Sequence, residues 1–140
     1  MSTEQRNDFG FAVAVQLIRF GILYAGVELL PLLGFTPWWT SFTVNVLCCV
    51  YAAVLMSVLR LWQSSGMLTG WRSWRAALLL VPLVVEALAW GLPDGIVPLD
   101  PGYGWWALTL LLVGFNEELV SRGVVLSRLA RSFTVAAAVT

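Results

Sequence analysis

Residues 105–123, WWALTLLLVGFNEELVSRG, join an uncharged apolar run to a group of charged and polar side chains. The run up to Phe115 contains no charge, and Glu117, Glu118 and Arg122 follow directly after it. A charged residue inside a bilayer is costly, so such residues usually face a bundle interior or a water-filled cavity. The stretch therefore predicts a membrane-spanning helix that carries a functional or structural charged group.

The composition of the whole chain is typical of a membrane protein. Of the 140 residues, 59% are hydrophobic and 11% are charged, whereas about a quarter of a soluble globular domain is usually charged. Eight arginines balance eight acidic residues, and lysine and histidine are absent. Because no basic cluster is present, we expect no nucleic-acid partner. Cys48 and Cys49 are adjacent in an apolar run, so we interpret them as small buried hydrophobic residues.

Four apolar segments approach the roughly 20 residues that a spanning helix needs. They lack the two-residue alternation of barrel strands, so we expect helices. The predicted fold class is therefore all-α, a polytopic transmembrane helical bundle in which residues 1–140 form a single membrane domain. The four predicted spans are residues 9–33, 38–61, 74–92 and 103–129.

Arginine and tryptophan predict the orientation of the bundle in the cell membrane. Arginines border the segment between the second and third spans and follow the fourth: Arg60, Arg72, Arg75, Arg128 and Arg131. The segment between the third and fourth spans carries only acids, Asp94 and Asp100. Because positive residues favour the cytoplasmic side, we expect both chain ends inside. Tryptophans fall at the span ends, where indoles meet the membrane interfaces.

The three charged residues of the opening stretch allow two interpretations. Glu117 follows Trp105 by about 18 Å at 1.5 Å per residue, which places it in the inner half of the membrane. Glu118 and Arg122 are four residues apart and can pair. Glu117 is then free to meet a substrate or water and to act as a general base. Alternatively, the long side chains reach the interface and the Glu118–Arg122 pair is a structural anchor.

Other polar residues fall inside the predicted spans. Arg19 and Glu86 lie at similar depths on the first and third spans, and we expect a structural ion pair between them. Gln16 and Asn45 are expected to form interhelical hydrogen bonds. Glu28 is expected near the outer interface, where it is solvated.

The stretch EELVSRGVVLSRLARSF, residues 117–133, resembles the first signature of the CPBP family. These are the CAAX-processing and bacteriocin-processing membrane proteases, also called the Abi family. Their signature is EExxxR, continued by a glycine, aliphatic residues and a second basic residue. The matching positions are Glu117, Glu118, Arg122, Gly123, Val124, Val125, Leu126 and Arg128. Ser121 departs from the pattern, because the family often has an aromatic residue there.

The resemblance implies an endopeptidase whose active site lies within the membrane and whose substrate is a protein or peptide. Carried over by position, Glu117 would activate the attacking water, and Glu118 and Arg122 would support and orient the site. A complete family member is expected to use either a divalent metal such as zinc or a metal-free glutamate and histidine. Glu117 is the only candidate metal ligand here, because its partner histidine is absent.

The two later signatures of the family, FxxxH and HxxxN or HxxxD, do not occur in these 140 residues. We therefore expect an incomplete CPBP domain that is inactive by itself, since the glutamates and arginine supply too few metal ligands and oxyanion donors. One alternative is a non-catalytic membrane scaffold or immunity protein that binds partner helices or forms a homo-oligomer. Another is half of a transporter or channel, with Arg19, Glu86 and Glu117 along a polar path.

Overall fold

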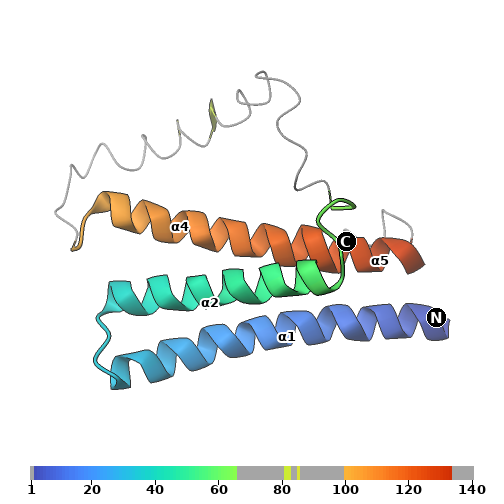
Figure 1. The fold of residues 1–140 in the computed structure, drawn as a ribbon, viewed down its shortest axis with the longest axis horizontal. Helices are drawn as coiled ribbons and strands as arrows, with labels where there is room; N and C mark the ends of the chain where they lie inside the picture. The colour runs from blue at the N-terminus through green and yellow to red at the C-terminus, as the bar shows by residue number, and fades with distance from the viewer. Residues whose placement is uncertain (1, 66–80, 83–84, 86–99, 134–140) are drawn as a thin grey trace.

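The structure, a computed structural model, describes residues 2–65, 81–82, 85 and 100–133. All regular structure in these residues is helical, which confirms the all-α prediction for the described part of the chain. The elements are α1 (Thr3–Leu32), α2 (Pro37–Val58), α4 (Tyr103–Glu118), a π-helix η2 (Leu119–Leu126) and α5 (Ser127–Ser132). Figure 1 shows α4, η2 and α5 as one continuous rod.

Two helices, α1 with 30 residues and α2 with 22, are long and apolar enough to cross a membrane. At 1.5 Å per residue they measure roughly 45 and 33 Å, and the hydrocarbon core of a bilayer is about 30 Å thick. The rod from Tyr103 to Ser132 exceeds the fourth predicted span by three residues at its end. The third predicted span, residues 74–92, lies outside the described residues except for 81, 82 and 85.

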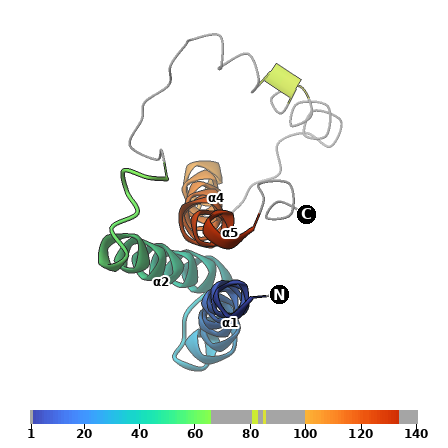
Figure 2. The same cartoon turned by 90° about the vertical axis from the view of Figure 1, so that its right-hand side faces the viewer.

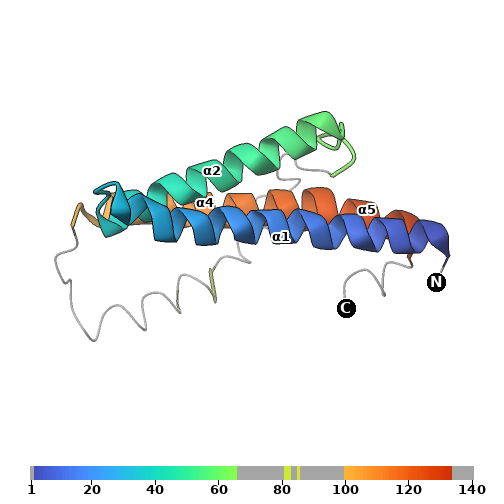
Figure 3. The same ribbon diagram turned by 90° about the horizontal axis from the view of Figure 1, so that it is seen from below.

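The described helices pack side by side along their lengths. Helix α2 contacts both α1 and α4, and α1 also contacts η2 and α5. Helices α2 and α4 run in the same direction and α1 runs in the opposite one (Figures 1 and 3). Viewed end on in Figure 2, α1, α2 and α4 lie at the corners of a triangle. We call the end with Ser2 and Ser132 the inner end, and the opposite end the outer end.

Sequence signals at the helix ends explain where α1 begins and ends. Ser2 caps α1 by accepting a hydrogen bond from the Gln5 backbone N–H at 3.1 Å, and the Gln5 side chain accepts one from the Ser2 N–H at 2.9 Å. This reciprocal pair is a capping box. At the other end Gly34 adopts a left-handed φ of 87°. The Phe35 N–H then reaches the Leu30 carbonyl at 3.2 Å, which completes a Schellman motif.

Helix α2 ends by the same motif but with arginine in the left-handed position. Arg60 has a φ of 54°. Its N–H donates to the Ser57 carbonyl at 3.1 Å, and the Leu61 N–H donates to the Met56 carbonyl at 2.9 Å. The left-handed position usually holds glycine because a Cβ is disfavoured there. The turn places Leu61 in the core, where it is buried.

The apolar core lies in the inner half of the bundle, between α1, α2 and η2. Met56 is fully buried at its centre. The other members come from the three helices and the turn after α2: Val15, Ala52, Leu61, Leu119, Val120 and Val124. Helices η2 and α2 approach each other closely here, since a methyl group added at Gly123 would lie 2.6 Å from the Met56 sulfur. Glycine at this position lets η2 lie directly against α2.

Large apolar side chains also cover the outside of the bundle. Examples from three helices are Leu17, Tyr24, Val50, Leu110 and Leu111, all exposed. Soluble monomers rarely expose contiguous apolar patches beyond a few hundred Å². An outer surface of this kind is suited to contact with lipid. At the outer end Trp38 packs edge-on against Trp105, with ring centroids 5.6 Å apart, so the beginnings of α2 and α4 lie together.

Candidate functional site

Glu117 is not free, which corrects the expectation from its position. The Arg19 Nη2 donates to Oε1 of Glu117 at 3.1 Å, so the first helix holds this carboxylate. Arg19 is buried, with 7% of its surface exposed, whereas the Glu117 side chain is 56% exposed. The predicted partner of Arg19, Glu86, lies outside the described residues. The arginine therefore supports the candidate site itself.

Asn116 connects this ion pair to the third helix of the group. Its side chain is completely buried. It accepts a hydrogen bond from Arg19 Nε at 2.9 Å and donates to Asn45 Oδ1 at 3.2 Å. Asn45 in turn donates to the Ser41 carbonyl at 2.9 Å. The result is a polar chain across α1, α4 and α2, and it confirms the interhelical role predicted for Asn45.

Two other polar residues of α1, Gln16 and Glu28, differ in how far they match the expectations. Gln16 does not form the expected interhelical bond, because within the described part of the chain its buried Oε1 has no hydrogen-bond partner. The prediction of an interhelical hydrogen bond was therefore wrong for Gln16 Oε1. Glu28 is exposed, as expected, and its placement at a membrane interface stays a prediction. Cys48 is fully buried, which agrees with its interpretation as a small hydrophobic residue.

The predicted pairing of Glu118 with Arg122 is confirmed. Arg122 Nε lies 3.2 Å from Glu118 Oε2, and the Arg122 and Glu118 side chains are 64% and 51% exposed. An exposed pair of this kind contributes little to stability, about 0–1 kcal/mol. Its main effect is to fix the direction of both side chains beside Glu117. Gly114, one turn earlier, has no neighbour within 4 Å of an added methyl group and leaves space there.

The EExxxR segment begins at the end of α4, which holds Glu117 and Glu118, and continues into the π-helix η2, which holds Arg122. The sequence analysis did not predict the π-helix. In η2 the turn is longer than the 3.6 residues of an α-helix. Leu119, Val120 and Val124 are fully buried and Gly123 is buried beside them. The two polar pairs that alternate with these buried residues are exposed: Glu117 with Glu118, and Ser121 with Arg122. A four-residue repeat of polar and apolar pairs in EELVSRGV, residues 117–124, is the signal that could have predicted it.

The inner end of the bundle is closed by a second polar group around Asp8. Arg128 Nε lies 2.6 Å from Asp8 Oδ1, and the Ser132 hydroxyl donates to Oδ2. The Gln5 side chain also donates to the Ser132 carbonyl at 3.0 Å. The hydrogen bond from Ser132, and then the bond and charge of Arg128, hold the pKa of Asp8 below its usual 3.8 against the effect of burial. The second basic residue of the signature thus ties α5 to α1.

The glutamates do not form a metal site with their neighbours. In residues 2–65, 81–82, 85 and 100–133, no three side chains of His, Cys, Asp or Glu come together. Zinc sites in proteins use three or four such ligands. The residues present therefore do not fit a metal by themselves. What the arrangement offers chemically is one carboxylate, Glu117, held in place by a buried guanidinium and half open to its surroundings.

Comparison with protein-family models, curated proteins and solved structures finds no match for this chain.

Proposed function

We propose that the chain is a multi-pass protein of the cell membrane, with four spans and both described ends on the cytoplasmic side. The lengths of α1 and α2 and the exposed apolar surface support this proposal. The parallel course of α2 and α4 supports the proposal that they are the second and fourth of four spans. Arg6, Arg60, Arg128 and Arg131 gather toward the inner end, as positive residues do at the cytoplasmic side.

Cysteine labelling on intact cells tests this placement. Cys48 and Cys49 are first replaced by alanine, and single cysteines are introduced by Thr3→Cys and Gly102→Cys at the two ends of the bundle. A membrane-impermeant maleimide is expected to label position 102 in intact cells and position 3 only after permeabilisation. The reverse pattern would overturn the orientation, and labelling of both positions in intact cells would overturn the span count.

For activity, we propose that the chain supplies the carboxylate half of an intramembrane endopeptidase of the CPBP type. The observation that carries the proposal is the placement of Glu117, which lies half exposed beside Glu118 and is held by Arg19 at 3.1 Å. The resemblance of residues 117–133 to the family signature gives this geometry its chemical meaning.

The proposed roles follow from the contacts. Glu117 accepts a proton from the attacking water, while Arg19 fixes its Oε1 and leaves Oε2 without a hydrogen bond from the described residues. Glu118 and Arg122 hold each other beside it. Stabilising the oxyanion and protonating the leaving nitrogen need further donors, the histidines of the family. Because the 140 residues contain no histidine, this chain alone is expected to have no hydrolytic activity.

The gene beyond the codon for Thr140 provides the first test. Apolar segments that carry FxxxH and then HxxxN would supply the other half of the site. In the protein from that gene, Glu117→Gln is expected to slow hydrolysis of a hydrophobic peptide by about 10²–10⁴, the usual contribution of a general base. Glutamine keeps an oxygen for Arg19, so folding is preserved. Glu28→Gln, the same change at an exposed site, should leave the rate unaltered.

Two results would contradict the protease. One is unrelated sequence after Thr140 together with no hydrolysis in the presence of any co-expressed membrane protein from the same operon. The other is an unchanged rate for the Glu117→Gln protein.

A non-catalytic scaffold or immunity protein is the second candidate, and one observation favours it. Both glutamates are already engaged by arginines, at 3.1 and 3.2 Å. In a scaffold these pairs only connect and orient helices. The double variant Glu118→Leu/Arg122→Met would then keep partner binding and folding, as measured by co-purification and thermal unfolding. Loss of function with folding intact would favour the enzyme instead.

A further inference from the structure

A groove at the inner end of the bundle has the lining of a site for an amphipathic anion. It measures about 420 Å³ and lies between the turn after α2 and the η2–α5 segment. Its polar lining comes from two arginines and three serines: Arg122, Arg131, Ser64, Ser65 and Ser127. It is separate from the Arg19–Asn116 network, which shares none of these residues.

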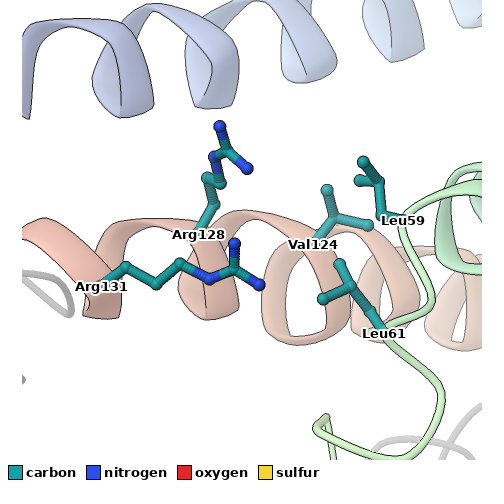
Figure 4. A pocket seen from close by; sticks show the side chains of 5 residues that line it. All are labelled: Leu59, Leu61, Val124, Arg128 and Arg131. Atoms are coloured by element: carbon teal, nitrogen blue, oxygen red, sulfur yellow. The ribbon is translucent and has the colours of Figure 1, made fainter. Parts of the chain in front are cut away.

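Of the two arginines that line the groove, Arg131 is the one without an ion pair to the described residues, although its charge also acts on Asp8. Arg19, Arg122 and Arg128 each have a carboxylate within 3.2 Å. Arg131 is exposed and forms no ion pair with the residues that the structure describes. Figure 4 shows that Arg128 extends toward α1, whereas the Arg131 side chain runs back along its own helix toward Leu61. Figure 4 draws the smaller neighbouring pocket, and Arg131 lines both that pocket and the groove.

The charge balance of the groove matches a singly charged anion. Arg122 and Arg131 together carry two positive charges, and Glu118 balances one of them. The hydroxyl of Ser127 lies on the same wall, where it donates to the Arg122 carbonyl at 3.3 Å. Guanidinium groups recognise phosphate through paired N–H donors. A phosphodiester carries one negative charge and accepts such bonds.

The remaining lining is apolar, which distinguishes a lipid from a free anion. Leu61, Leu126 and Ala130 form this part of the groove. Trp62, next to Leu61, is partly buried against the core cluster. A ligand that fits both parts has a charged headgroup joined to a hydrocarbon body. Basic pockets between membrane helices on the cytoplasmic side bind anionic headgroups in this way.

We propose that this groove binds the headgroup phosphate of an anionic phospholipid of the cytoplasmic leaflet, with Arg131 and Arg122 as the phosphate ligands. The proposal rests on the membrane placement given above but not on protease activity. It assigns to the end of the EExxxR segment a contact that is separate from the chemistry of Glu117.

The test is lipid binding to the purified full chain in uncharged detergent, followed by native mass spectrometry. Phosphatidylglycerol and phosphatidylcholine with the same acyl chains are added in equal parts. The unmodified chain is expected to retain phosphatidylglycerol preferentially. Arg131→Gln should weaken that binding about fivefold, the usual effect of one basic residue near an anionic headgroup. Arg6→Gln removes the same charge from an exposed site at the same end, and should change binding little.

A second variant is expected to change lipid binding in the opposite direction. Glu118→Gln removes the balancing charge beside Arg122 and is expected to strengthen phosphatidylglycerol binding several-fold. Equal losses in Arg131→Gln and Arg6→Gln would overturn the site in favour of general charge attraction. Displacement of the lipid by inorganic phosphate would overturn the lipid in favour of a free anion. Glu117→Gln should leave lipid binding unchanged, so failure of the protease proposal and failure of the lipid site are distinguishable.

Discussion

Arg19 and Glu117 are 98 positions apart in the chain and form an ion pair of 3.1 Å between α1 and the end of α4. The same guanidinium donates to the buried Asn116 at 2.9 Å. One side chain of α1 thus holds two consecutive residues near the end of α4. The position of the candidate site depends on this contact between distant parts of the sequence.

A double-mutant cycle measures the pair. Arg19→Gln is expected to lower the free energy of unfolding by about 1–3 kcal/mol, because it leaves buried Asn116 Oδ1 without its charged donor. The coupling between Arg19→Gln and Glu117→Gln should be smaller, about 0.5–1 kcal/mol, since the Glu117 side chain is more than half exposed. Denaturant unfolding in detergent provides both numbers. Strictly additive effects would show that the pair makes no energetic contribution.

Gly114 in α4 and Gly123 in η2 provide a matched test of packing. A methyl group at Gly123 would lie 2.6 Å from the Met56 sulfur, whereas one at Gly114 has no neighbour within 4 Å. Gly123→Ala is expected to lower the unfolding free energy by about 1–3 kcal/mol through overpacking. Gly114→Ala should be neutral or stabilising by up to about 1 kcal/mol through helix propensity. Equal unfolding free energies for the two variants would contradict the close packing of η2 against α2.

Arg60 occupies the left-handed position that Gly34 occupies at the end of α1. Arg60→Gly is expected to raise the unfolding free energy by about 1 kcal/mol, because a Cβ is disfavoured at this φ. Arg60→Ala removes the same charge but keeps the Cβ, so it is the control. The difference between the glycine and alanine variants in thermal unfolding isolates the backbone effect. An alanine variant as stable as the glycine one would contradict the strained turn.

The Asp8 carboxylate, which precedes the first predicted span, should make the inner end sensitive to acid. Its pKa is lowered in the folded state, so its contribution to stability is present above the ordinary value of 3.8 and is lost as the pH falls below it. The melting temperature of the unmodified chain should therefore approach that of Asp8→Asn below about pH 4. A difference between the two that stayed constant down to pH 2 would exclude this contribution.

The local features of the fold were readable from the sequence because they depend on neighbours along the chain. The apolar length of α1 and α2, the Glu118–Arg122 spacing and the burial of Cys48 are of this kind. The extension of α1 back to Thr3 was missed, although Ser2 and Gln5 are a recognisable capping box. The first span was predicted from apolar length alone, and the residues before Phe9 are mostly polar.

The features that define the site were not readable, because they join distant segments. Hydropathy gave the approximate depth of Arg19 but did not identify its ion-pair partner. Nothing in the sequence favours Glu117 over Glu86 as that partner. The sequence analysis assigned no role to Asn116, which directly precedes the two glutamates. Asn116 is the centre of the interhelical hydrogen-bond network. The π-helix was missed because an α-helical period was assumed where the polar and apolar pairs repeat every four residues.

The partners of Arg19 are synthesised long after Arg19 itself. Asn116 and Glu117 follow it by 97 and 98 residues, and at about 5–20 residues per second a ribosome needs roughly 5–20 s to reach them. During this interval the Arg19 guanidinium lacks these two partners, and a long arginine side chain in apolar surroundings can extend its charged end to water. Arg128 reaches Asp8 later still, 120 residues on. The side-chain contacts that hold Arg19 and Asp8 of α1 therefore form only after the α4–η2–α5 segment has been synthesised.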